Sequence, residues 1–239
     1  MVISIHQPDY IPYLGYFYKL AKSDKFVYLD DAQYSNDNMH NWNKIKTPQG
    51  ELRLKIPVEN HLGDLINAVR TRDELKWKDK QLKTIEMNYG KAPYFAEIFP
   101  QFKELLLKDY TDIAQMNIAI NTWIAKSFGM KAEFYRSSQM NIDSVREERV
   151  IDICVALGGD TYISGHGASV YQEEEHFTDR GVKLLYTDYE PIEYKQLWPK
   201  AGFLHNMSVL DYIFNCGFDW EYVENQVEMI LNNAKEEQA

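Results

Sequence analysis

The first residues of the chain, MVISIHQPDYIPYLGYFYKLAKSDKFVYLDD (Met1–Asp31), contain three successive patterns. Met1–Ile5 is a short run of mainly apolar, β-branched residues, which predicts a buried strand. Pro12 suits the first turn of a helix, and apolar residues then recur at helical spacing up to Ala21. Lys25–Asp31 predicts a second buried strand. A strand, a helix and a strand in this order form a βαβ unit, whose strands are parallel and whose crossover is right-handed.

Strand and helix patterns continue to alternate along the chain. Strands are expected at 51–58, 65–71, 131–138, 161–165 and 182–189, and helices at 77–89, in two pieces over 99–128, from Ser144, from Ser208 to Gly217 and at about 219–236. Alternation of this kind is typical of an α/β fold. We therefore predict a mostly parallel, doubly wound sheet in a single domain, residues 1–239, with a helical insertion at about 77–130.

The composition excludes several classes of protein. The formal net charge of −10 argues against a nucleic-acid-binding protein or one that binds anionic membranes, because both need a basic face. Cys154 and Cys216 belong to no CxxC motif, so reduced thiols are expected. No signal peptide and no apolar run of about 18 residues is present, which predicts a cytoplasmic protein without membrane insertion.

The loop after the first strand has a composition suited to a ligand site. Loops at the carboxyl ends of parallel strands bind ligands, and the N-terminus of the following helix favours anions. His6 would act as an acid, a base or a phosphate donor, with Gln7 beside it and Gly15 giving access to backbone N–H groups. In the alternative interpretation His6 and Gln7 only fasten the loop, and Tyr10, also a candidate contact, belongs to the core.

The segment Asp30–Gly50 is a second candidate loop. Its carboxylates, amides, aromatic rings and lysines suit a nucleotide, and a simple surface hairpin is the alternative. The binding residues expected in this segment are Asp30, Gln33, Tyr34, Asn43, Lys44 and Lys46. Asp30 and Asp31 are also a candidate pair for Mg²⁺ beside a nucleotide, and no cluster of residues predicts a dedicated metal site.

A third candidate loop follows the strand predicted at 161–165. Ser164 and Gly165 allow close approach of a ligand to the backbone, and His166, which lies between Gly165 and Gly167, is a candidate catalytic residue that donates to an oxyanion or a phosphate. Glycine in a turn also has a purely conformational explanation. By contrast, Ser208 and Asp211 are explained by helix capping.

Five segments in this order resemble the WbqC-like family of bacterial proteins. They are HQPDYIPYLGYFYKL, SDKFVYLDDAQY, NWNKIKTPQG, YISGHGASVY and SVLDYIFNCG, and together they cover nearly the whole chain up to Gly217. Family members often have an arginine where this chain has Trp42, so a phosphate contact expected from that arginine would come from Lys44 or Lys46 instead. The YLGY segment (Tyr13–Tyr16) also resembles the HxGH element of nucleotidylyltransferases and pantothenate synthetases, which implies a related fold.

The resemblance implies a role in the synthesis of O-antigen and other surface polysaccharides. In this role the protein would act on nucleotide-activated amino sugars. We therefore expect an enzyme that acylates or aminoacylates the amine of a nucleotide sugar, with ATP and Mg²⁺ as cofactors if the acid is first adenylated. A non-catalytic protein that binds sugar nucleotides and a nucleotidyltransferase are the alternatives. The expected partner is a small-molecule nucleotide sugar, and a homodimer is the expected assembly if the chain oligomerises.

Overall fold

The central sheet has five parallel strands in the order β7-β2-β1-β8-β9. The structure is a computed structural model and describes residues 1–170 and 172–236. The strands of this sheet are β1 (Val2–His6), β2 (Lys25–Tyr28), β7 (Glu133–Arg136), β8 (Thr161–Ser164) and β9 (Lys183–Tyr186). The helices are α1 (Leu14–Ala21), α2 (Trp77–Tyr89), α3 (Phe95–Leu107), α4 (Ile113–Ser127), α5 (Arg146–Ala156), α6 (Glu174–Thr178), α7 (Val209–Cys216) and α8 (Trp220–Glu236).

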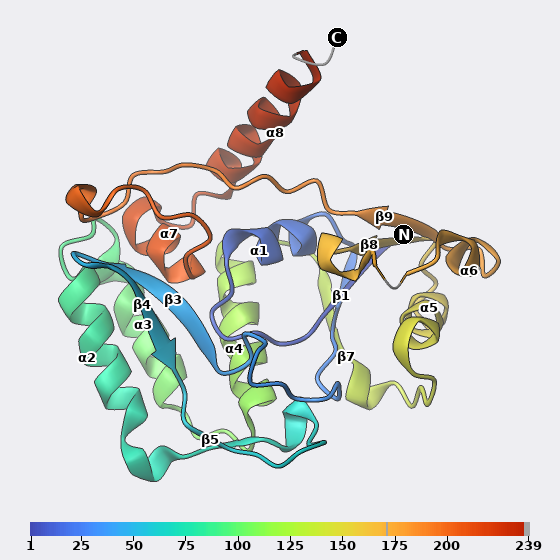
Figure 1. The fold of residues 1–239 in the computed structure, drawn as a ribbon, viewed down its shortest axis with the longest axis horizontal. Helices are drawn as coiled ribbons and strands as arrows, with labels where there is room; N and C mark the ends of the chain where they lie inside the picture. Colours follow the sequence, from blue (N-terminus) through green and yellow to red (C-terminus); the bar gives the residue numbers. More distant parts are fainter. Residues whose placement is uncertain (171, 237–239) are drawn as a thin grey trace.

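Helices cover both faces of the sheet because the side chains of each strand alternate between the faces. Ile3, Ile5 and Val27 belong to one core with residues of α5 and α6. Phe26 and Tyr28 belong to the other core, with residues of α1 and α4. Figure 1 shows the resulting arrangement, with α5 and α6 on the side of the molecule away from α2 and α3. The predicted doubly wound α/β fold is therefore confirmed.

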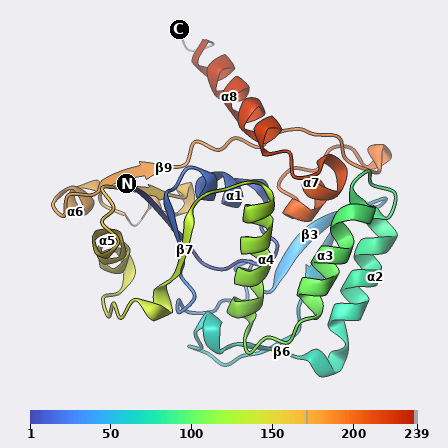
Figure 2. The same cartoon turned by 180° about the vertical axis from the view of Figure 1, so that it is seen from behind.

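The segment between β2 and β7 contains most of the additional structure. It forms the antiparallel hairpin of β3 (Trp42–Thr47) and β4 (Gly50–Lys55), the short strands β5 (Val58–Glu59) and β6 (Arg70–Thr71), and helices α2 to α4. α2 and α3 lie beside each other at one end of the molecule, whereas α4 packs against α1 and leads back to the sheet (Figure 2).

Three local predictions outside α7 were wrong. Only Arg70–Thr71 of the strand predicted at 65–71 is a strand, because Ile66–Ala68 forms a 3₁₀ turn. Ser144 does not cap α5, because its hydroxyl donates to Asp152 Oδ2 at 2.6 Å and the helix begins at Arg146. Trp42–Thr47 is a strand of a hairpin rather than part of a long loop.

The cap at the start of α7 was predicted correctly for Ser208 and wrongly for Asp211. The Asp211 carboxylate accepts instead from the Tyr89, Tyr194 and Gln196 side chains. The Ser208 hydroxyl accepts from the Leu210 N–H, and α7 ends at Gly217 with φ +76. Beyond it, α8 extends away from the body of the molecule (Figure 1). Both cysteines are free thiols. Within the described residues, no helix combines the length and the apolar character that crossing a membrane requires.

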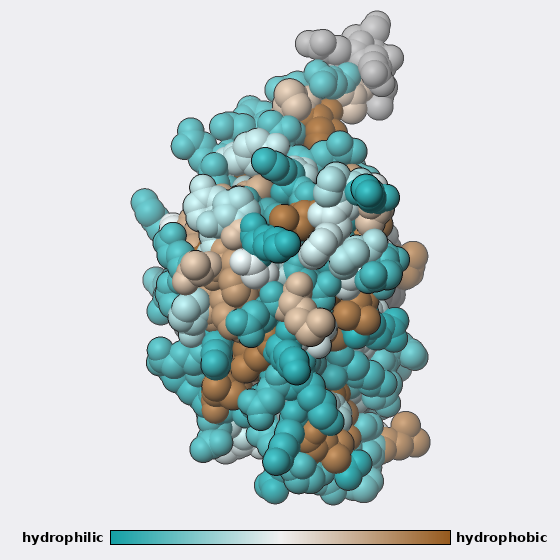
Figure 3. Space-filling view, turned by 90° about the vertical axis from the view of Figure 1, so that its left-hand side faces the viewer, coloured by the Kyte–Doolittle hydropathy of each residue, from teal (hydrophilic) through white to brown (hydrophobic). Residues whose placement is uncertain are grey.

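The surface on the side of α2 and the hairpin is mostly hydrophilic, with apolar side chains in separate groups (Figure 3). The interior on this side contains a buried polar network. The Tyr89 hydroxyl donates to Asp211 Oδ1 at 2.7 Å, and the Lys46 backbone N–H donates to the same hydroxyl at 2.9 Å. This polar network joins the hairpin to α2 and α7.

Buried asparagines hold the loop between β1 and α1, residues 7–13. The carbonyl oxygens of residues 8–11 each accept a hydrogen bond of 2.8–3.0 Å from an asparagine amide. The donors are Asn117 for residue 8, Asn121 for residue 9 and Asn43 for residues 10 and 11. Ile11 has φ +38, which is strained for a β-branched residue, so the loop depends on these external bonds.

We predict that Asn117→Ala destabilises the protein by about 1–3 kcal/mol for each buried carbonyl that loses its donor. Asn117 Nδ2 donates to two carbonyls, those of Pro8 and His40, both at 2.8 Å. The free energy of unfolding from urea titration measures the effect. Asn232→Ala, on an exposed position of α8, is the control and should change stability by less than about 0.5 kcal/mol. Equal effects of the two variants would contradict the proposed role of the asparagine.

Candidate functional site

The carboxyl ends of β1 and β8 lie where the sheet changes direction. From β1 the chain moves outward to β2, and from β8 it moves outward on the other side to β9. β1 pairs with β2 as far as His6 but with β8 only as far as Ser4. The two strands therefore part at their carboxyl ends. Open α/β sheets form their ligand crevice at such a point.

A cavity of about 1150 Å³ opens there. Five of the predicted site residues line it, and they come from two distant parts of the chain: His6 and Gln7 follow β1, and Ser164, Gly165 and His166 end β8 or follow it. Tyr171, the last residue of the quoted YISGHGASVY segment, lies outside the described residues. The fold thus brings the first and third candidate loops to one site.

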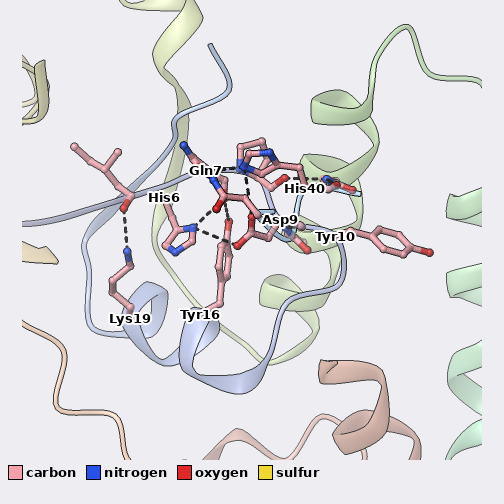
Figure 4. Close-up of polar contacts among 12 residues, drawn as sticks. His6, Gln7, Asp9, Tyr10, Tyr16, Lys19 and His40 are labelled. Atoms are coloured by element: carbon pink, nitrogen blue, oxygen red, sulfur yellow. Dashed lines mark hydrogen bonds and ion pairs between the residues drawn. The ribbon is translucent and has the colours of Figure 1, made fainter. Parts of the chain in front are cut away.

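Three further predicted residues lie next to the cavity and support its wall. The buried Tyr10 points away from His6 (Figure 4) and donates from its hydroxyl to Gln81 Oε1 at 2.7 Å. A side chain at Gly15 would lie 2.4 Å from the Tyr13 ring and 2.6 Å from the Tyr189 ring. Asn43 is one of the asparagines that hold the loop. In this structure these residues have packing roles.

The residues predicted in the second candidate loop do not line this cavity, but other residues of the same loop do. Lys44 pairs with Glu51 across the hairpin at 3.0 Å, and the buried Lys46 donates to Gln196 Oε1 and to the carbonyl of residue 202. Gln33 and Tyr34 line a second, polar cavity of about 460 Å³. Residues 37–39 of the second candidate loop line the first cavity. These residues were not selected from the sequence.

Asp30 and Asp31 do not fit a Mg²⁺ site. Asp30 is buried and accepts from Arg136, with Nη2 at 2.6 Å and Nε at 2.8 Å. Arg149 forms an ion pair of 2.5 Å with Asp31. Because a guanidinium already neutralises each carboxylate, neither is available as a metal ligand.

His6 presents a free ring nitrogen to the cavity. Its Nδ1 lies 3.0 Å from the carbonyl oxygen of Gln7, which only accepts, so we assign the proton to Nδ1. Nε2 has no hydrogen-bond partner among the described residues. Burial, and then the charge of Lys19, lower the pKa of His6 to about 3. The imidazole is therefore neutral at pH 7, with a lone pair available on Nε2.

A second histidine orients Gln7. The buried His40 donates from Nε2 to Gln7 Oε1 at 2.9 Å (Figure 4). Burial lowers the pKa of His40 to about 4, so it is a neutral donor. With its oxygen held in this way, Gln7 keeps its amide nitrogen as a donor for a ligand in the cavity.

Asp9 and Lys19 also line the cavity, and sequence reasoning did not select them. Burial raises the pKa of Asp9 to about 7, against the opposing charge of Lys19. Burial likewise lowers the pKa of Lys19 to about 7, and Asp9 opposes this shift. The sequence did contain one indication that Lys19 lies near the site. Lys19 follows Gly15 by four residues, which places both on the same helix face. Perturbed groups in a crevice, together with His6, indicate a functional site.

The turn after β8 leaves its backbone open to the cavity. A Cβ atom at Gly165 or Gly167 would meet no described atom within 4 Å, and neither glycine has a positive φ. His166 stacks on Tyr186 with ring centroids 5.8 Å apart. The exposed Arg146 also lines the cavity. It has no hydrogen bond or ion pair to the described residues, and its φ is +56. This combination suits an anionic ligand such as a phosphate.

We predict that His6 stays neutral at pH 5, in the Nδ1–H form, while His176 is protonated. His6 has a lowered pKa, whereas the hydrogen bond from His176 to Glu147 raises the pKa of His176 above 6.5. Nitrogen-15 shifts of the two imidazoles in an NMR titration distinguish these states. A His6 that titrates near pH 6.5 would contradict the assignment.

We predict that Gly167→Ala raises the free energy of unfolding by about 0.4–1 kcal/mol, because the turn neither crowds a Cβ nor needs a positive φ. Chemical denaturation measures this change. Gly159→Ala is the contrasting control, since its Cβ would lie 2.3 Å from Ile3 Cγ1 and should destabilise the fold. Loss of stability in Gly167→Ala would mean that the fold itself needs this glycine.

Comparison with known proteins gives matches over most of the chain. The WbqC-like protein family matches residues 7–221, which include most of the residues that line the cavity, although His6 lies just before the matched range. The chain is 31% identical over 219 residues to the uncharacterized protein Rv1507c of Mycobacterium tuberculosis, and the alignment covers 90% of this chain and 94% of that protein. No solved structure matches the chain. The protein belongs to the WbqC-like protein family.

Proposed function

We propose that the protein transfers an acyl group to the amine of a nucleotide-linked amino sugar bound in this cavity. The observation that carries the proposal is the neutral His6, whose Nε2 has no partner among the described residues and which lines the same cavity as an open glycine turn. Such a reaction would belong to the biosynthesis of O-antigen or another surface polysaccharide, the setting that the family resemblance implies.

The proposed step uses His6 as a base. The neutral sugar amine attacks the acyl carbon of an activated donor, such as an acyl adenylate, and forms a tetrahedral intermediate with a positively charged nitrogen. His6 Nε2 accepts a proton from this nitrogen, the bond from the acyl carbon to the leaving group breaks, and the leaving group departs with the electron pair. The ammonium of this intermediate is more acidic than the ammonium form of the free sugar amine, and the departure of the leaving group completes the proton transfer to His6.

Other residues that line the cavity support the binding of a pyrophosphate group. The Gly165–Gly167 turn lets a ligand approach the backbone, and Arg146, which has no ion pair to the described residues, can form two parallel hydrogen bonds to a phosphate. The volume of about 1150 Å³ accommodates a ligand as large as a nucleotide sugar. The alternative of a nucleotidyltransferase loses its candidate Mg²⁺ ligands, since Asp30 and Asp31 are paired with arginines.

We predict that His6→Ala lowers the rate of amide formation by about 10²–10⁴-fold, the usual contribution of general base catalysis. A thermal-shift screen with ATP, CTP, UDP-sugars and dTDP-amino sugars first identifies the ligand, because selective binding raises the melting temperature. Mass spectrometry then detects the acylated sugar. His205→Ala, an exposed histidine outside the cavity, is the matched control and should retain full activity.

Two results would reject the proposal. Full turnover by His6→Ala would remove the base from the mechanism. Tight binding of a sugar nucleotide without any product, over the range of acyl donors, would identify a non-catalytic binding protein.

A further inference from the structure

A buried lysine in the cavity wall lacks the partners that a buried charge needs. Lys19 is only 4% exposed, yet it lines the cavity. Its Nζ donates to the carbonyl oxygen of Ile5 at 2.9 Å (Figure 4). Ile5 lies just beyond Ser4, where the pairing of β1 with β8 ends. The ammonium therefore lies at the base of the crevice between these two strands.

Two other cationic side chains, one buried and one partly buried, are better satisfied. Lys46 donates to a side-chain oxygen and to a backbone carbonyl, and Arg136 forms an ion pair with Asp30. Among the described residues, Lys19 Nζ has a single hydrogen-bond acceptor and no carboxylate oxygen within 4 Å. The carboxylate of Asp9 lies instead near the two histidines, 3.8 Å from His6 Nδ1 and 4.0 Å from His40 Nε2.

An unpaired ammonium in this position weakens the fold, because its hydration is lost without a compensating charge. The two remaining N–H groups have no protein acceptor in the described chain, and the cavity is the space next to them. A ligand oxygen carrying negative charge would supply both the acceptor and the counterion. Lysine binds such groups as a point charge.

We propose that Lys19 binds an oxyanion of the ligand, a phosphate or a carboxylate, at the base of the cavity. The proposal rests on the proposed function in that it uses the same cavity, and it adds the position of one charged group of the substrates. The oxyanion lies beside His6, at the end of the cavity where the acyl donor reacts. A donor of this class carries a phosphate if it is an acyl adenylate, or a carboxylate if it is the free acid.

The test compares melting temperatures of the whole protein with inorganic phosphate, pyrophosphate, acetate and chloride. We expect phosphate, pyrophosphate or acetate to raise the melting temperature of the wild type more than chloride at equal ionic strength. In Lys19→Met and Lys19→Gln the Kd for that anion should rise at least tenfold. Lys19→Gln keeps a donor for the Ile5 carbonyl, so it tests the charge even if Lys19→Met folds poorly. Lys44→Met, on the exposed pair with Glu51, is the control with the same change in net charge.

The outcomes separate this inference from the proposed function. A wild type that responds to none of these anions overturns it without any variant. An equal response in the wild type and a folded Lys19 variant also overturns it, because the anion then binds elsewhere. If the anion binds at Lys19 but no amide product forms, the inference holds and the proposed acyl transfer fails. A preference for pyrophosphate over acetate identifies the group as a phosphate.

Discussion

The site depends on how the polar backbone of residues 7–13 is satisfied away from water. This loop leaves β1, adopts a strained φ at Ile11 and starts α1, so its own residues supply few of the hydrogen bonds that it needs. The amides of Asn43, Asn117 and Asn121 supply them from outside. Because His6, Gln7 and Asp9 belong to this backbone, the asparagines also fix where the cavity's polar groups point.

The segment between β2 and β7 is therefore part of the site's support. Asn43 lies on β3, while Asn117 and Asn121 are one turn apart on α4, which places both amides on the same helix face. The C-terminal segment is attached in the same way, since the Val209 N–H donates to the carbonyl of Pro12 and the Ser208 N–H to that of Lys44. A packed support of this kind lets a short irregular loop hold its side chains in a fixed geometry.

The sequence allowed the βαβ unit, the sheet type and most helices to be predicted, because apolar periodicity is a local signal. It could not show that Asn43 and Lys46 are buried: their polar side chains made β3 read as a loop, and their partners are far away in the chain. Asp30 was read as a ligand contact because Arg136 is 106 residues distant. Lys19 is ordinary by residue type, and only its burial against β1 distinguishes it.

The electrostatics of the cavity couple its two main groups. Burial and the Lys19 charge both lower the pKa of His6, so the empty site holds a weak base. An oxyanion bound to Lys19 would cancel the second of these causes and raise the basicity of His6. His6 would then be a stronger base in the complex with the donor than in the empty site. Such coupling would favour acyl transfer within the complete complex, and it needs no movement of the backbone.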